Sequence, residues 1–315
     1  MGKKPRVSIG LPVYNGEKYL EEALDSIIAQ TFTNFDLIIA DNASTDRTDE
    51  ICRAYAARDQ RIHYYRQDWN LGAAPNYNFV FDHASGEYFK WAAHDDMLAI
   101  EYLYKCVEVL DQNPDVVLCF TQAKMIDEYS KNLMEATYEG STNSPKPHYR
   151  FRNLALDIQN APKIPLLAFG LMRTGVVNKT GLIGNYPSSD VVFIAELALY
   201  GQFYEIPEPL FLWRNHPSQS VKGELASDRG RAVWFDSSLK DKIFLHKWMY
   251  LFGYVKAINR SPIGIYGKLY SYLQIFRWAL MPSNFRSIVK DVLLAVKELM
   301  IRTFLRLKET TAVNS

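Results

Sequence analysis

Short β-rich apolar segments alternate with amphipathic helical segments in the first part of the chain, and this alternation restricts the fold more than any other feature. The segments typical of strands are residues 7–11, 35–40, 62–66, 88–92 and 116–125, and those typical of helices are 19–28, 45–58, 73–84 and 100–113. Such segments form a mostly parallel central sheet with right-handed crossover helices on its faces. We therefore predict an α/β fold.

Polar residues follow directly after four of the predicted strands. They are Tyr14 and Asn15, Asp41 and Asn42, Asn70 to Gly72, and the adjacent pair Asp95 and Asp96. Parallel sheets bind ligands beyond the carboxyl ends of their strands. We therefore expect these four loops to converge on one crevice.

The pair Asp95 and Asp96 predicts a metal site in this crevice. Neighbouring carboxylates repel and resist burial unless a cation compensates them, and Mg²⁺ or Mn²⁺ on one or two carboxylates completes its shell with phosphate oxygens. The chain has neither Gly-x-Gly-x-x-Gly after the first strand nor Gly-x4-Gly-Lys-[Ser/Thr], so phosphates must be held in another way. A solvated turn that caps the next helix is the structural alternative.

Composition describes an ordinary folded protein and excludes some classes. Of the 315 residues, 48% are hydrophobic and 23% are charged. A net charge of +1 provides no general attraction for nucleic acid. Three widely spaced cysteines predict reduced thiols in a cytoplasmic protein, and the absence of an apolar run of about 18 residues predicts no spanning helix.

Several motifs in this order resemble the family 2 glycosyltransferases, which have the GT-A type fold. The motifs are Val-Ser-Ile-Gly-Leu-Pro-Val-Tyr-Asn at residues 7–15, Asp-Asn-Ala-Ser-Thr-Asp at 41–46, Asn-Leu-Gly at 70–72, and Gly-Glu-Tyr at 86–88 leading to Asp95-Asp96. The resemblance extends to about Pro217. It implies transfer of a sugar from a nucleoside diphosphate donor to an acceptor hydroxyl, with inversion at the anomeric carbon.

The resemblance implies roles for named residues. Nucleotide-binding positions are Pro12, Val13, Tyr14, Asn15, Glu17, Asp41, Asn42, Ser44, Asn70, Gly72, Asn76, Asp95 and Arg214. Asp95, Asp96 and His216 are the metal ligands, for Mn²⁺ or Mg²⁺, and Asp190 is the general base. A carboxylate at Asp41 accepts a hydrogen bond from an imide N–H, which favours a UDP- or dTDP-sugar, with guanine as the other base that fits.

Each role has a structural alternative. Tyr14 would stack on the base or simply cover the sheet edge, and Asp190 would be the base or only a helix cap. His216 before a proline is equally typical of a turn. The chain departs from the family at His94, in the position before the acidic pair, and at Tyr77, where the family often has Arg.

The C-terminal part differs in pattern. We predict a GT-A type domain at 1–224, with a nucleotide-sugar half at 1–125 and an acceptor half at 126–224 that contains an irregular loop at 127–147. A helical region at 225–315 follows, with helices at 233–255, 263–281 and 285–307 separated by Pro262 and Pro282. Its apolar stripe at 288–304 predicts packing on the protein itself or in a homodimer. The interleaved aromatic and basic residues, Tyr266, Tyr270, Tyr272, Phe276 and Trp278 among them, favour peripheral membrane contact.

The predicted function is therefore a metal-dependent glycosyltransferase acting on a glycan or lipid-linked glycan in cell-surface polysaccharide or glycolipid synthesis. A sugar nucleotidyltransferase is the alternative enzyme, although residues 12–17 offer only one of the glycines that its phosphate loop needs. A non-catalytic nucleotide-sugar-binding protein is the alternative from another class.

Overall fold

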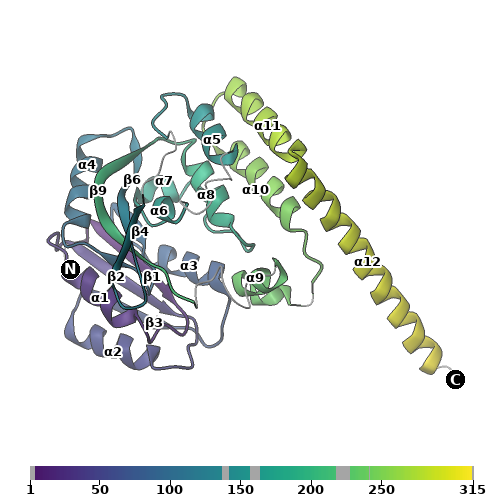
Figure 1. Cartoon of the computed structure of the whole chain (residues 1–315), viewed down its shortest axis with the longest axis horizontal. Helices are drawn as coiled ribbons and strands as arrows, with labels where there is room; N and C mark the ends of the chain where they lie inside the picture. Colours follow the sequence, from purple (N-terminus) through teal and green to yellow (C-terminus); the bar gives the residue numbers. More distant parts are fainter. Residues whose placement is uncertain (1–3, 137–141, 157–163, 218–227, 241, 314–315) are drawn as a thin grey trace.

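A computed structural model describes residues 4–136, 142–156, 164–217, 228–240 and 242–313. Within this part of the chain, nine strands form one sheet with the order β3-β2-β1-β4-β8-β6-β9-β5, and β7 pairs with β6 (Figure 1). The sheet is mixed and most of its strands point the same way. Helices flank it and a helical region follows, so the predicted fold class is confirmed.

The first four strands are parallel neighbours, as predicted. They are β1 (Val7–Val13), β2 (Phe35–Asp41), β3 (Ile62–Arg66) and β4 (Tyr88–Trp91). The helices that connect them are α1 (Leu20–Ile28), α2 (Thr48–Arg58) and α3 (Ala73–Asp82). Every residue of β1 and β2 is buried, because central strands of such a sheet are covered on both faces.

The second half of the sheet introduces antiparallel strands. After α4 (Tyr102–Gln112), β6 (Val116–Ile126) pairs in parallel with β9 (Gln202–Arg214). The short strand β8 (Leu171–Arg173) lies antiparallel between β4 and β6. The strands β5 (Met97–Leu98) and β7 (Asn132–Ala136) are also antiparallel to their neighbours.

Three local predictions need correction. Helix α2 begins at Thr48 rather than at residue 45, because Asp46 Oδ1 accepts a hydrogen bond from the Thr48 backbone N–H at 3.0 Å. The predicted loop at 127–147 contains β7, which forms a hairpin with β6. The helix predicted at 233–255 is interrupted: α9 (Asp228–Phe235) ends early, a 3-10 turn at Ser237–Leu239 follows, and α10 (His246–Arg260) begins later.

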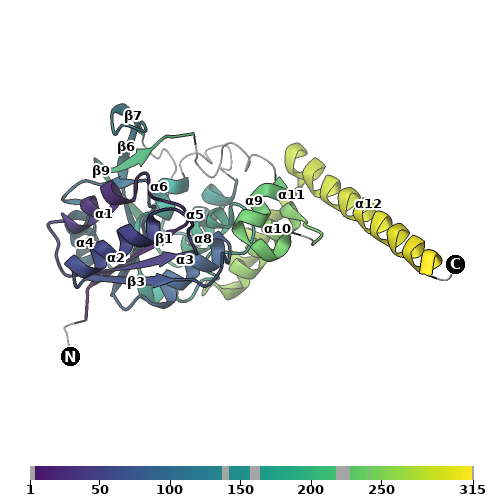
Figure 2. The same cartoon turned by 90° about the horizontal axis from the view of Figure 1, so that it is seen from below.

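The C-terminal helices pack on helices from the middle of the chain. Helices α5 (Pro147–Leu156), α6 (Ile164–Ala168), α7 (Thr174–Val177) and α8 (Ser189–Leu197) precede α10, α11 (Ile265–Leu280) and α12 (Pro282–Val313). Helix α11 packs against α5, and α10 contacts α8, α11 and α12. Trp278 of α11 is fully buried and its ring lies near those of Tyr250 and Tyr254, so α11 is part of the core. The far end of α12 projects away from the rest of the protein (Figure 2).

An apolar face of the last two helices is exposed. On α11 it comprises Ile265, Tyr266, Leu269, Leu273, Phe276 and Leu280, and it continues on α12 with Val289, Val292, Leu293, Val296, Leu299 and Met300. Of the predicted stripe on α12, Ile288 alone packs against the core, and the side chain of Phe304 lies outside the described residues. We call these exposed residues the α11–α12 face. No helix in the described part of the chain has an apolar stretch long enough to cross a membrane.

Cys52, Cys106 and Cys119 are free thiols in the core, as predicted. The boundary proposed at residue 224 falls between 218 and 227, outside the described residues.

Candidate active site

A cavity of about 720 Å³ lies beyond the carboxyl ends of the first four strands. We call it the donor cavity, after the nucleotide-sugar donor that the resemblance in the sequence implies. The predicted residues that line it are Pro12, Val13, Tyr14, Asn15, Asn42, Asn70, Asn76, Asp95, Asp96 and His216. The four loops that follow β1, β2, β3 and β4 therefore meet at one site. Glu17, Asp41, Ser44, Gly72, Arg214 and Asp190 are not among the lining residues.

The loops after β1 and β2 are held together by hydrogen bonds. The backbone N–H of Asn15 donates to Ser44 Oγ at 2.9 Å, and the backbone N–H of Thr45 donates to Asn15 Oδ1 at 2.8 Å. One turn further on, the backbone N–H of Arg47 donates to Glu17 Oε2 at 2.9 Å. Ser44 and Glu17 thus act on the loop backbone, and they place Tyr14, which is 39% exposed, at the cavity wall.

Asn42 fixes the loop after β3. Its Nδ2 donates to Asn70 Oδ1 at 2.9 Å and to the Gly72 carbonyl at 3.1 Å, while its Oδ1 accepts from the Leu71 backbone N–H at 2.9 Å. Gly72 has a φ of 94°, in the left-handed region that favours glycine. The Asn-Leu-Gly motif is therefore a turn shaped by Asn42.

Asp41 ends β2 and is fully buried beneath the cavity. Its Oδ1 accepts from the Ser44 backbone N–H at 2.8 Å, and its Oδ2 accepts from Tyr64 Oη at 2.9 Å and Arg66 Nη1 at 3.3 Å. A carboxylate has about four acceptor positions, so Oδ1 retains capacity for one further donor.

The pKa values of the two adjacent aspartates are shifted in opposite directions. His216 Nε2 lies 2.9 Å from Asp95 Oδ2. Burial disfavours ionisation of Asp95, but the charge of His94 and the contact with His216 outweigh it and lower the pKa of Asp95. Burial, together with the neighbouring charge of Asp95, holds the pKa of Asp96 well above its usual value. A further positive charge at this end of the cavity would let both carboxylates ionise.

Arg214 is buried behind the acidic pair. Its Nε donates to the Asp95 carbonyl at 2.8 Å, and its backbone N–H donates to Asp96 Oδ1 at 2.9 Å. Its two terminal nitrogens contact Ser130 Oγ and Glu22 Oε2, each at 2.9 Å. Arg214 thus supports the acidic turn and does not reach the cavity surface. The contact between Arg214 and a phosphate, which the resemblance implied, is not seen in this arrangement.

Asp95, Asp96 and His216 offer oxygen and nitrogen ligands to a divalent cation. The described residues contain no cluster of three or more Asp, Glu, His or Cys side chains arranged for a metal. Asp95 Oδ2 and His216 Nε2 nevertheless lie side by side on the cavity wall, and Asp96 lines the same wall. One or two protein ligands are enough for Mg²⁺ or Mn²⁺ when a diphosphate and water complete the shell. The residues therefore fit a cation that is bound together with its nucleotide.

Asp190 is the second residue of helix α8 and is half-buried. Burial raises the pKa of its carboxyl group. Tyr77 lines the donor cavity, and the pKa of its hydroxyl group is raised. Burial is the largest cause, the charge of Asp95 is the next, and the charge of Asp190 is the third. Asp190 thus lies close to the donor cavity without belonging to its wall.

Sequence reasoning missed one wall of the cavity. Gly230, Val233 and Trp234 of α9 line it, although they belong to the helical region assigned to membrane or dimer contacts. Their spacing of three and four residues puts them on one helix face, which is the signal that would have found them.

Asn76 has one amide atom bonded and one without a partner. Its Nδ2 donates to the Ala40 carbonyl, while its buried Oδ1 has no partner among the described residues.

A mixed sheet of this topology, with a polar cavity at the carboxyl ends of its strands and a helical C-terminal region, is a GT-A type fold. The model of the family described as "Glycosyl transferase family 2" matches residues 8–172, more than half of the chain. The chain belongs to this family, and the resemblance found in the sequence is confirmed.

Relatives and solved structures agree with this membership. An uncharacterized glycosyltransferase of Rickettsia typhi is 26% identical over 319 residues, covering 95% of this chain and 93% of the relative. The glycosyltransferase GlyG of Streptococcus pneumoniae is 36% identical over 115 residues, covering 36% of this chain and 38% of the relative. The structure of residues 1–349 of S. aureus TarS with UDP-GlcNAc has a TM-score of 0.62 at 15% identity, covering 91% of this chain and 79% of that chain. At this identity the likeness concerns the fold.

Proposed function

We propose that this protein is an inverting glycosyltransferase that moves a sugar from a UDP- or dTDP-sugar to a hydroxyl group of a glycan or lipid-linked glycan. The observation that carries the proposal is the donor cavity itself. Tyr14 and Asn42 line it, next in sequence to the buried carboxylate of Asp41, and Asp95 and Asp96 line the same cavity. An exposed aromatic ring suits a planar base, and two adjacent carboxylates suit a cation that holds a diphosphate.

Asp190 is the proposed general base. It accepts the proton of the acceptor hydroxyl while that oxygen attacks the anomeric carbon on the face opposite the nucleotide. The bond between the anomeric carbon and the diphosphate oxygen breaks, so the configuration inverts and the nucleoside diphosphate leaves. Burial raises the pKa of Asp190, which makes its carboxylate a stronger base than an exposed aspartate.

Asp95, Asp96 and His216 are the proposed ligands of Mn²⁺ or Mg²⁺. Such a cation supplies Lewis-acid neutralisation of the charge that develops on the leaving diphosphate. Arg214 positions the acidic turn through the Asp95 carbonyl and Asp96 Oδ1.

Two substitutions separate donor binding from catalysis. We expect Asp190→Asn to lower transfer at least about 100-fold and to leave UDP affinity unchanged, because the base acts on the acceptor. We expect Asp96→Asn to weaken UDP binding in the presence of Mn²⁺ at least about tenfold. Calorimetry with UDP and Mn²⁺ and a donor-consumption assay with a panel of nucleotide sugars measure the two effects. UDP is the first nucleotide to test, because TarS was solved with it.

The alternatives give different results. A retained activity of Asp190→Asn refutes the base assignment. A protein that binds UDP and Mn²⁺ but consumes no nucleotide sugar is a sensor. Formation of a nucleotide sugar from a nucleoside triphosphate and a sugar phosphate indicates a nucleotidyltransferase.

We further propose that the α11–α12 face rests on an anionic membrane surface, where a lipid-linked acceptor for polysaccharide or glycolipid synthesis would lie. Its outward apolar residues include Tyr266 and Phe276, with exposed fractions of 70% and 60%. Between residues 265 and 302 the chain has six Lys and Arg residues and two acidic ones, which complements a negatively charged surface. Tyr270 and Tyr272 are only partly exposed and Trp278 is buried, so they contribute less than the sequence predicted.

A further inference from the structure

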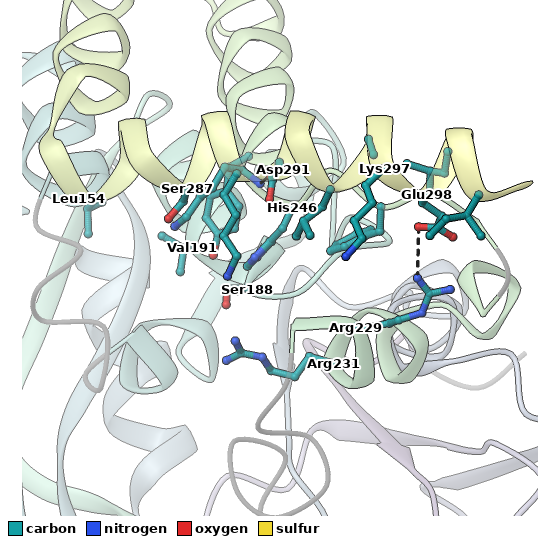
Figure 3. A pocket seen from close by; sticks show the side chains of 18 residues that line it. Leu154, Ser188, Val191, Arg229, Arg231, His246, Ser287, Asp291, Lys297 and Glu298 are labelled. Atoms are coloured by element: carbon teal, nitrogen blue, oxygen red, sulfur yellow. Dashed lines mark hydrogen bonds and ion pairs between the residues drawn. The ribbon is translucent and has the colours of Figure 1, made fainter.

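A second cavity of about 740 Å³ lies between α12 and the body of the protein (Figure 3). We call it the basic cavity. Its lining includes residues of α8, α9, α10 and α12 and of the segment before α10. Basic side chains reach it from several of these elements: Arg229, Arg231, His246, Lys247, Lys290 and Lys297. In Figure 3 the side chains of Lys297 and Arg231 extend into the space from opposite walls.

The basic cavity has more positive than negative charge. Five Lys and Arg residues line it, against the carboxylates of Asp291 and Glu298. Both carboxylates already have partners: Asp291 Oδ2 accepts from the Lys247 backbone N–H at 2.7 Å, and Glu298 pairs with Arg302 at 2.5 Å and with Arg229 of the cavity wall at 3.7 Å. Lys290 and Lys297 form no ion pair with any residue that the structure describes. A ligand with a negative charge is therefore favoured.

The same cavity has an apolar side. Ile243, Phe244, Leu294 and Ile301 line it together with the cations. Leu294 and Ile301 are 53% and 49% exposed, although both side chains are large and aliphatic. Covering them with an apolar chain would remove this surface from water. The lining thus suits an amphiphile better than a small inorganic anion.

The basic cavity lies next to the proposed base. Ser188 and Val191, which flank Asp190 in the sequence, both line it. Helix α9 separates it from the donor cavity, because Arg229 and Arg231 line the basic cavity while Gly230 lines the donor cavity. The two cavities are therefore neighbours with α9 between them, and the basic cavity lies close to Asp190. An acceptor in the basic cavity would approach the donor from the side of the base.

We propose that the basic cavity binds the acceptor, and that the acceptor is an amphiphile with a phosphate or diphosphate between its sugar and its apolar chain. The proposal rests on the proposed function in treating the bound molecule as the acceptor. The chemical class of the ligand follows separately from the charge and the apolar lining of the cavity. Lys290 and Lys297 are the residues that contact its phosphate.

Binding of simple amphiphiles to the full-length protein tests this proposal. The probes are dodecyl phosphate and dodecyl maltoside below their micellar concentrations, and inorganic phosphate. Calorimetry is expected to show one site for dodecyl phosphate, with an affinity at least about tenfold higher than that for dodecyl maltoside. The double variant Lys290→Gln/Lys297→Gln is expected to lose about tenfold in affinity for dodecyl phosphate and to bind dodecyl maltoside as before.

A matched variant controls for the loss of charge. Lys256→Gln/Arg286→Gln removes two exposed cations from α10 and α12 that do not line the cavity, and it is expected to bind dodecyl phosphate like the unmodified protein. An equal loss in both double variants overturns the proposal, as does equal affinity for the charged and neutral amphiphiles. Inorganic phosphate that competes as effectively as dodecyl phosphate overturns the amphiphile class.

Competition with nucleotide separates this proposal from the proposed function. UDP with Mn²⁺ is expected to bind without displacing dodecyl phosphate, because the two cavities are distinct. Displacement places the probe in the donor cavity and overturns the proposal. Failure of both UDP and dTDP to bind, with dodecyl phosphate binding intact, refutes the proposed donor and with it the acceptor role, while the ligand class of the basic cavity stands.

Discussion

A buried arginine holds the acidic turn of this protein in place. Arg214 is fully buried, and its side-chain donors contact the carbonyls of Asp95 and Asp127, the Ser130 hydroxyl and the Glu22 carboxylate. A planar guanidinium can serve several acceptors at fixed angles, whereas an ammonium group of similar length cannot. The position of the Asp95 backbone therefore depends on this side chain, whereas Asp96 Oδ1 is held by the backbone N–H of Arg214.

Replacement of this arginine by lysine is expected to cost stability as well as function. Arg214→Lys should lower the free energy of unfolding by about 3 kcal/mol, because buried oxygen acceptors lose their donors. Urea unfolding of the nucleotide-free protein measures the change. Arg53→Lys, at a 64% exposed side chain that pairs with Asp49 along a helix, serves as control and should change stability by less than about 0.5 kcal/mol. An unchanged stability of Arg214→Lys with weakened UDP binding would support the phosphate contact predicted from sequence.

The sequence predicted only some of the polar residues that form the cavity wall. The prediction was correct for Tyr14, Asn70 and Asp95, which follow strands, because the sheet fixes where strands end. Sequence position does not tell a ligand-facing side chain from one that bonds the backbone of a neighbouring loop, as Glu17 does. Trp234 was missed because it reaches the site from a helix far along the chain.

At the scale of elements, the loop after β3 and helix α9 are packed backbone against backbone. A Cβ atom at Gly72 would lie 2.6 Å from the Phe235 carbonyl oxygen and 2.9 Å from Asp236 Cα. The same helix brings Val233 and Trp234 to the donor cavity. The turn at Gly72 therefore sets how close α9 can approach the nucleotide site.

We expect Gly72→Ala to move α9 outward. The positive φ and the backbone contact together should lower the free energy of unfolding by about 2 to 3 kcal/mol, and UDP affinity should fall about tenfold. Gly175→Ala is the matched control, because nothing lies within 4 Å of its new Cβ, and it should be neutral or slightly stabilising. Urea unfolding and calorimetry measure both variants. Unchanged UDP affinity in Gly72→Ala would show that α9 does not depend on this turn.

The helices and strands were predicted well where the hydrophobic periodicity is strong. They were predicted less well where a strand forms only because it pairs with a neighbouring strand. The parallel strands and their helices were correct, since a buried strand and an amphipathic helix each have a clear local pattern. The antiparallel position of β8 was not predictable, because a strand of three residues contains no information about its neighbour. The edge strand β7 was taken for a loop for a similar reason: four of its five residues are exposed and show no alternation.

At the scale of the whole molecule, the α11–α12 face lies on the same C-terminal region as the basic cavity. Helix α12 provides residues to both: Val289 and Val296 are exposed, whereas Lys290 and Lys297 line the cavity. A membrane under this face would present a lipid-linked acceptor next to the cavity that we assign to it. Truncation at residue 224 would not test membrane binding alone, because it would also remove the buried side chain of Trp278 from the core.

Substitutions on the surface of α11 give a sharper test of membrane binding. The full-length protein is expected to float with vesicles that contain phosphatidylglycerol. The triple variant Leu269→Ser/Leu273→Ser/Phe276→Ser should lose at least about tenfold in vesicle affinity, because each side chain is more than half exposed and would be buried in the interface. The control Leu133→Ser/Met134→Ser removes exposed apolar side chains from β7, on another part of the protein, and should float unchanged. Equal flotation of all three proteins contradicts membrane docking, and a dimer in sedimentation that the triple variant abolishes would instead assign this face to a second copy of the chain.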